Sequence, residues 1–149
     1  MDKKSILIVD DDKTILKSLQ DVLRLEGYYV DGVETGREAL EKSEAGFYNL
    51  ALIDIKLPDM EGTELLKKMH DSFPKMIRII VTGYPDLENA VKSLNFGADA
   101  YLVKPVDTRK LLKVVAEKMR EQQEAEEITQ EKVGKWIETR VRKLRRGEL

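Results

Sequence analysis

Short apolar runs alternate along the chain with stretches whose apolar residues recur every three or four positions. The short runs have the length of buried β-strands, and the wider spacing is typical of one face of an α-helix. The runs predict strands at residues 5–9, 28–33, 50–53, 76–81 and 101–103. The wider spacing predicts helices at residues 13–26, 36–44, 62–73, 85–96 and 107–119.

Local signals at the helix ends support these boundaries. Thr35 can cap the second helix, because its hydroxyl can accept a hydrogen bond from the first turn. Asp12 can cap the first helix in the same way, which is a plainer role than binding an ion. Pro85 and Asp86 suit the first turn of the fourth helix. The third helix should end before Pro74, since proline disfavours helical geometry in the residue that precedes it.

Five strand–helix pairs in succession predict an α/β fold, with one parallel sheet and helices on both of its faces. Of the two common doubly wound strand orders, the flavodoxin-like order 2-1-3-4-5 is the one that suits five strands. In that order the first and third strands are neighbours. Asp10 and Asp11 follow the first strand, so they should lie beside Asp54, which follows the third.

Polar residues come directly after four of the predicted strands. They are Asp10, Asp11, Asp54, Thr82 and Lys104. Open α/β folds bind their ligands at the carboxyl-terminal edge of the sheet, so these groups should meet at a candidate site there. Carboxylates crowded at one edge repel one another, and a bound cation relieves the repulsion.

The types of ligand at this edge favour a hard cation, because no histidine or cysteine accompanies the carboxylates. A few carboxylates that leave positions for water and phosphate suit Mg²⁺ better than Ca²⁺. Residues 10–12 also lack the alternating ligands and the distal glutamate of an EF-hand loop. A lysine and a threonine can bind phosphoryl oxygens, which makes Asp54 a candidate nucleophile that forms an aspartyl phosphate.

Composition narrows the classes of protein that fit. The chain has 149 residues, a formal net charge of -2 and no cysteine. Its length suits one ordinary domain with an appendage, and its charge provides no general attraction to nucleic acid. The lack of cysteine excludes disulfides and thiolate ligands. No stretch approaches the roughly 18 apolar residues that a membrane span needs, so we expect a soluble cytoplasmic protein.

Four stretches closely resemble the receiver domain of two-component response regulators. They are Val-Asp-Asp at 9–11, Leu-Ile-Asp-Ile-Lys-Leu-Pro-Asp-Met-Glu-Gly at 52–62, Val-Thr-Gly at 81–83 and Tyr-Leu-Val-Lys-Pro at 101–105. The resemblance covers roughly residues 4–120, with every hallmark in order. It implies a receiver domain at residues 1–120 whose partner is a sensor histidine kinase, the donor of a phosphoryl group.

The resemblance also implies a role for each site residue. Asp54 would be the phospho-acceptor, and Lys104 would pair with the phosphate. Asp10 and Asp11 would bind Mg²⁺ together with Asp54 and the main-chain carbonyl of Lys56. In this family the peptide bond between Lys104 and Pro105 is cis, as an X–Pro bond readily allows.

Two residues would report the phosphorylated state to the rest of the domain. Thr82 would contact the phosphoryl group and shift on activation, and Tyr101 would be an aromatic switch that moves inward with it. Lys56 and Tyr84 occupy positions that tune hydrolysis of the acyl phosphate in such domains. His70, the single histidine, is expected to be a solvated residue near the end of the third helix.

Residues 121–149 form a charged amphipathic extension that contains no recognised effector domain. After an acidic, glutamine-rich run, an apolar stripe appears at Val133, Trp136, Ile137, Val141 and Leu144. Either the fifth helix continues through the extension, or Thr129 caps a separate helix. Gly134 would weaken an uninterrupted helix by about 1 kcal/mol.

The role of the extension has three interpretations. The apolar stripe favours packing or homodimerisation through the fifth helix and the extension, because an isolated amphipathic helix needs a partner. The basic residues from Arg140 to Arg146 can contact nucleic acid, which is a less favoured interpretation. The extension can also be a linker.

The favoured function is a signalling relay that catalyses only its own phosphorylation and dephosphorylation. An alternative is a Mg²⁺-dependent phosphohydrolase with an aspartyl-phosphate intermediate. Against it, such an enzyme normally needs a second acid and a substrate-binding cap, and no segment is long enough to supply a cap. A third class, an interaction module with a vestigial site, is disfavoured because every expected chemical group is present.

Overall fold

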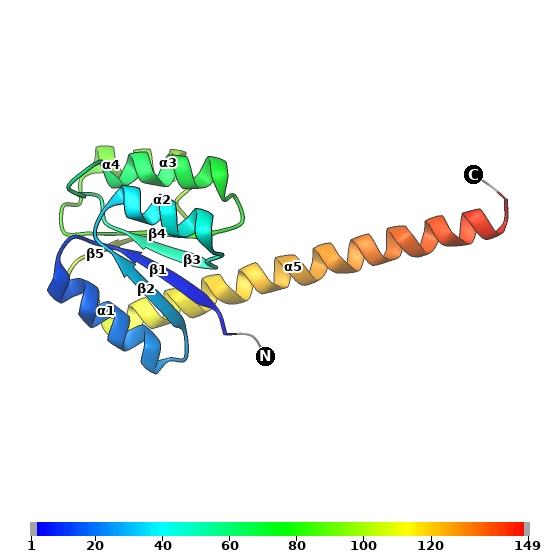
Figure 1. Cartoon of the computed structure of the whole chain (residues 1–149), viewed down its shortest axis with the longest axis horizontal. Coiled ribbons are helices and arrows are strands. Elements are labelled where there is room, and N and C mark those ends of the chain that lie inside the picture. Colours follow the sequence, from blue (N-terminus) through cyan, green and yellow to red (C-terminus); the bar gives the residue numbers. More distant parts are fainter. Residues whose placement is uncertain (1–2, 148–149) are drawn as a thin grey trace.

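Five parallel strands form a single sheet at the centre of the protein, in the order β2-β1-β3-β4-β5 (Figure 1). The structure is a computed structural model that describes residues 3–147. Its strands are β1 (Ser5–Val9), β2 (Tyr29–Val33), β3 (Leu50–Ile53), β4 (Ile77–Thr82) and β5 (Ala100–Val103). Its helices are α1 (Lys13–Leu25), α2 (Gly36–Ala45), α3 (Gly62–Ser72), α4 (Leu87–Asn95) and α5 (Thr108–Arg145). The predicted α/β fold and strand order are confirmed.

The register of the strands brings distant parts of the chain to one edge of the sheet. Val9, the last residue of β1, lies opposite Ile53, the last residue of β3. The main-chain N–H of Asp54 donates to the carbonyl of Val9 over 3.0 Å, and that of Lys104 donates to the carbonyl of Thr82 over 2.8 Å. The residues that follow β1, β3 and β5 therefore share the carboxyl-terminal edge.

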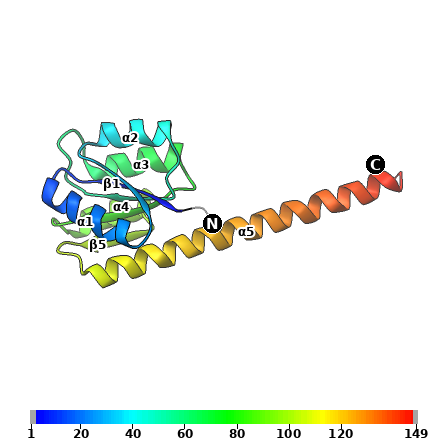
Figure 2. The same cartoon turned by 60° about the horizontal axis from the view of Figure 1, so that its bottom comes forward.

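Helices cover both faces of the sheet, and each face has its own apolar core (Figures 1 and 2). Successive side chains of a strand point to opposite faces, so Ile6 and Ile8 join one core while Leu7 and Val9 join the other. The first core lies under α1 and α5, and the second lies under α2 and α3. The buried residues that α5 contributes to the first core are Leu111, Val115 and Met119.

The helix caps agree with the sequence except at α4. Asp12 and Thr35 cap α1 and α2, as predicted. Pro85 and Asp86 lie before α4 rather than in its first turn, so that prediction was wrong by about half a turn. Asp86 is the N-cap, and its carboxylate accepts a hydrogen bond from the N–H of Asn89 over 2.7 Å.

The last helix, α5, runs without interruption for 38 residues. The alternative of a separate helix capped by Thr129 is therefore wrong, and the hydroxyl of Thr129 instead donates to the carbonyl of Ala125 inside α5. The second half of α5 extends away from the rest of the protein (Figures 1 and 2). The boundary predicted at residue 120 falls inside this helix, and its role as a domain boundary stays a prediction.

Gln122 fastens α5 to the amino-terminal edge of the sheet. Its side-chain amide donates to the carbonyls of Asn49 and Lys75 over 3.0 and 2.9 Å, and it accepts from the side chain of Asn49 over 3.1 Å. Beyond this point every residue from 123 to 147 is exposed. No helix within residues 3–147 is both long and apolar enough to cross a membrane.

Candidate functional site

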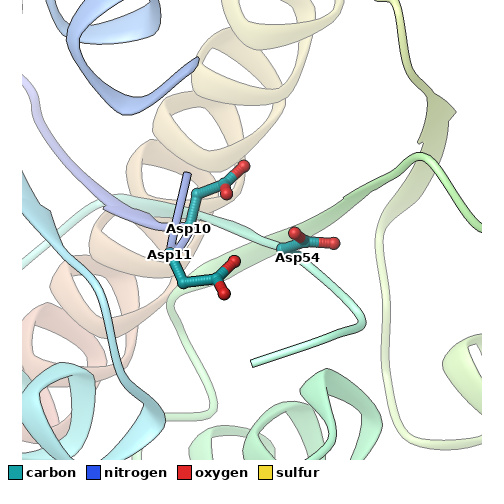
Figure 3. A group of neighbouring side chains, drawn as sticks. All are labelled: Asp10, Asp11 and Asp54. Carbon is teal, nitrogen blue, oxygen red and sulfur yellow. The ribbon is translucent and has the colours of Figure 1, made fainter. Parts of the chain in front are cut away.

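Three carboxylates meet at the ends of β1 and β3. Asp10 and Asp11 lie on the side of β1 that faces Asp54 (Figure 3). One carboxylate oxygen from each residue lies within 4.8 Å of the other two. The prediction that topology brings these residues together is confirmed.

Burial separates the three carboxylates into two kinds. Asp10 and Asp54 are buried, with 3% and 6% of their surface exposed, whereas Asp11 is open to solvent. Asp10 also accepts a hydrogen bond from the N–H of Asp12 over 2.9 Å. The site thus has a fixed, enclosed side and an open side from which water or a ligand can approach.

Lys104 joins the two buried carboxylates. Its ammonium lies 2.6 Å from Oδ2 of Asp10 and 3.2 Å from Oδ2 of Asp54. The bond between Lys104 and Pro105 is cis, as expected. One lysine faces three carboxylates, so the site keeps a formal excess of negative charge.

The pKa values of Asp54 and Lys104 are both raised, for different physical reasons. Burial raises the pKa of Asp54, and the charge of Asp10 adds to the rise, while Lys104 acts in the opposite direction. Burial alone would lower the pKa of Lys104, but the hydrogen bond and charge of Asp10, together with Asp54, raise it. Lys104 therefore stays charged, and Asp54 loses its proton less readily than an isolated aspartate.

The donor set fits a small hard cation. The cluster offers carboxylate oxygens only, with one residue open to solvent, as Mg²⁺ prefers when it keeps water or phosphate ligands. A divalent ion would offset the excess negative charge and favour the ionised form of Asp54.

Gly62, which the sequence predicted only as the start of a helix, closes the loop behind Asp54. A Cβ atom at residue 62 would collide with the main-chain oxygen of Asp54. The N–H of Gly62 also donates to the carbonyl of Ile55 over 2.6 Å. Only glycine allows this close approach, so Gly62 is a positioning residue for the loop that carries Asp54 and Lys56.

Thr82 and its neighbours form a second group at the same edge. Thr82 is the last residue of β4 rather than the first residue after it, and it is fully buried. Its hydroxyl accepts a hydrogen bond from the N–H of Tyr84 over 3.0 Å. The ammonium of Lys56 lies 4.1 Å from the centre of the Tyr84 ring, a cation–π contact. This contact joins the loop that follows β3 to the loop that follows β4.

Tyr101 lies apart from the carboxylates, against the core under α3. Its ring is partly buried, and its hydroxyl is enclosed without a hydrogen-bond partner within residues 3–147. Burial raises the pKa of Tyr101, and the charge of Asp86 adds to this. Tyr101 is therefore a neutral group that packs beside α4.

His70 is more than the solvated residue that the sequence predicted. It is exposed, but its Nδ1 lies 3.0 Å from Nη2 of Arg78. Arg78 is buried in β4, and its guanidinium donates to the carbonyls of Phe73, Met76 and Gly97. This arginine network lies away from the carboxylate cluster, and a charged residue within an apolar run was the only sequence sign of it.

Known proteins share this arrangement of sequence and fold. The model of the response regulator receiver domain matches residues 6–116. The response regulator receiver domain protein (CheY-like) from Methanospirillum hungatei JF-1 has a crystal structure with 56% sequence identity and a TM-score of 0.82. That comparison covers 83% of this chain and 99% of the other.

Two curated relatives are longer than this chain. The transcriptional regulatory protein ZraR of Klebsiella oxytoca is 39% identical over 112 residues, which are 75% of this chain and 25% of that protein. The response regulator ArlR of Staphylococcus aureus is 36% identical over 107 residues, which are 72% of this chain and 48% of that protein. The chain therefore matches a quarter to about half of each relative's length.

Proposed function

Because the chain belongs to the response regulator receiver domain family of two-component systems, we propose that it is a cytoplasmic protein that accepts a phosphoryl group on Asp54 from a sensor histidine kinase. The observation that carries the proposal is a pair of salt bridges. Lys104 lies within 3.2 Å of two buried carboxylates, in the same cluster as the exposed carboxylate of Asp11. We assign the receiver to residues 1–120 and treat residues 121–149 as an extension.

The carboxylates of Asp10, Asp11 and Asp54, with the main-chain carbonyl of Lys56, would hold Mg²⁺. When bound, the ion would neutralise charge on the phosphoryl oxygens and on the carboxylates. The excess negative charge of the cluster and the lack of nitrogen or sulfur ligands within it support this assignment.

In the reaction that we propose, a carboxylate oxygen of Asp54 attacks the phosphorus of a phosphohistidine. A phosphorus–oxygen bond forms as the phosphorus–nitrogen bond breaks, and the histidine nitrogen leaves with the electron pair and takes up a proton. Lys104 then pairs with the phosphoryl oxygens in place of a carboxylate.

The hydroxyl of Thr82 would transmit the change. It now accepts from the N–H of Tyr84, and it can instead donate to a phosphoryl oxygen after a small movement. Tyr101 would then repack beside α4, because its ring is only partly buried against the apolar core and lies near Asp86, the N-cap of α4. Such a shift between two states is how a local charge change alters a distant surface.

Phosphorylation by acetyl phosphate with Mg²⁺ tests the proposal. Intact-mass measurement should show stable addition of one phosphoryl group, which Asp54→Asn abolishes. Asp12→Asn is the matched control and should behave like the wild type, because asparagine also caps a helix and Asp12 lies one residue beyond the carboxylate cluster.

Two results would overturn this proposal. Continuous release of phosphate without an accumulated adduct would identify a phosphohydrolase instead. A complete lack of Mg²⁺-dependent modification of the wild-type chain, with its fold verified by circular dichroism, would exclude both activities.

A further inference from the structure

The exposed half of α5 repeats the apolar side that its first half buries. Val115 and Met119 lie in the core, and Val133 and Ile137 follow each of them by 18 residues. Eighteen residues are five full turns, so all four side chains lie on the same side of the helix. We call Val133, Trp136, Ile137, Val141 and Leu144 the distal stripe; they are 39–62% exposed.

A groove lies where α5 leaves the sheet. It has a volume of 510 Å³ and is bounded on one side by α5 and on the other by the amino-terminal edge of the sheet. Phe47 and Ile77 form apolar parts of its wall, and Phe47 is 68% exposed. From α5, Gln122, Ala125 and Gln130 line the opposite wall. Its α5 wall extends from Lys118 to Gln130, which is long enough to lie against a bound helix.

Charges along the exposed part of α5 are segregated. Residues 121–131 contain five glutamates and no lysine or arginine. Residues 132–146 contain seven lysines and arginines and one glutamate. Side by side in a parallel pair, two such helices would place like charges together. In an antiparallel pair each acidic segment would face the basic segment of the other helix.

We propose that two copies of this chain pair antiparallel, with residues 132–146 of each copy lying in the groove of the other. The distal stripe would cover Phe47, Ile77 and Ala125, and the basic segment would lie along the acidic residues 121–131. The contact is isologous, so both grooves are filled and the assembly closes as a dimer. This inference does not depend on phosphoryl transfer.

The geometry disfavours the same chain as occupant of its own groove. The helix is continuous through Gly134, so the distal stripe of each copy is carried away from its own groove (Figures 1 and 2). A chain that filled its own groove would have to break α5 into a hairpin. A second copy meets the groove with α5 intact.

Two isoleucines provide a matched test of the apolar contact. Ile137 and Ile128 are 50% and 53% exposed. They are nine residues apart, which is two and a half helical turns, so they lie on opposite sides of α5. Ile137→Asp should weaken the dimer at least about tenfold, as loss of a central apolar contact does. Ile128→Asp should leave it unchanged. Sedimentation equilibrium of the unphosphorylated full chain measures both, and equal effects of the two variants would overturn the proposed face.

The direction of pairing has its own test. Two spin labels at Arg145→Cys, in a chain with no native cysteine, should lie about 40 Å apart along the axis of an antiparallel dimer and far closer in a parallel one. Raising the salt concentration should weaken the antiparallel dimer, because it screens the opposed charges. A short label distance, or a dimer strengthened by salt, would overturn the antiparallel arrangement.

Trp136, the single tryptophan, distinguishes the remaining occupants. Its fluorescence should shift to the blue as the concentration rises and the dimer forms. A blue-shifted monomer would assign the groove to the same chain and overturn the proposal. A monomer with exposed Trp136 that binds duplex DNA through the basic segment would also overturn it. Failure of acetyl phosphate labelling would leave these measurements unaffected, so the two proposals fail separately.

Discussion

The two halves of α5 have the same apolar repeat and opposite surroundings. Val115 is fully buried in the core beneath the sheet, whereas Val133, five turns farther along the same side, is 51% exposed. Gln122 marks the change, since it bonds to the sheet edge and the described residues that follow it, 123–147, are all exposed. One continuous helix thus passes from a region held by tertiary packing to one held by local interactions.

This difference shows what an amphipathic pattern can and cannot specify. The pattern predicts that a segment is helical and which side is apolar. It does not identify the surface that covers that side, which is the sheet for the first half of α5. Most of the stability of helices in proteins comes from packing of their amphipathic side, so the second half of α5 favours a covering surface of its own. Substitutions placed at equivalent positions in the two halves measure how far they differ.

The largest expected effect comes from placing a charge at equivalent positions. Val115→Asp should destabilise the domain by about 4 kcal/mol or more, because it buries an unpaired carboxylate in the core. Val133→Asp should change domain stability by less than about 0.5 kcal/mol, as exposed substitutions usually do. Urea unfolding followed by far-ultraviolet circular dichroism, at concentrations where the chain is monomeric, gives both free energies.

Equal losses of stability in these two variants would contradict the comparison. They would mean that the second half of α5 supports the domain from which it extends. Val133→Thr, which keeps the shape of the side chain without a full charge, serves as the control for a local loss of helix.

The fold could be predicted from the sequence because its determinants are local. Buried strands are continuous apolar runs, and each helix carries its own caps, as Asp12 and Thr35 illustrate. Strand order then followed from the number of strand–helix pairs. The same topology predicts Asp10 beside Asp54, because residues that follow neighbouring parallel strands share an edge of the sheet.

Features that depend on contacts with particular main-chain carbonyls were not predictable. The hydrogen bonds between Arg78 and the carbonyls around it need the exact path of a loop. The close approach of Gly62 to Asp54 and the attachment of Gln122 to the sheet edge are of the same kind. The sequence did not determine whether α5 continues past Thr129. Capping residues and glycines change the preference for a helix boundary by about 1 kcal/mol, and packing can override that preference.

A smaller effect should follow from removing the attachment between the two halves. Gln122→Ala deletes three hydrogen bonds to Asn49 and Lys75, and should destabilise the domain by roughly 1–2 kcal/mol. Gln123→Ala is the matched control, because the Gln123 side chain is exposed and its hydrogen bond goes to Glu127 on the same helix. Chemical unfolding of the two variants should differ in midpoint. Identical midpoints would show that Gln122 adds nothing beyond the apolar contacts of the first half.

The smallest expected effect comes from Gly134, in the exposed half of α5. A Cβ added at Gly134 would meet no atom within 4 Å, so Gly134→Ala changes only the intrinsic preference for helix. It should stabilise the second half of α5 by about 1 kcal/mol and leave the unfolding of the domain unchanged. Gly147→Ala is the opposite control, because Gly147 has a φ of 72° at the end of α5 and alanine is strained there. The rates of amide hydrogen exchange in residues 123–147 measure the effects of both substitutions. We expect slower exchange in Gly134→Ala and faster exchange near the end of α5 in Gly147→Ala. If exchange in Gly134→Ala did not slow, contacts outside the helix, rather than its own helix propensity, would already hold this half in place.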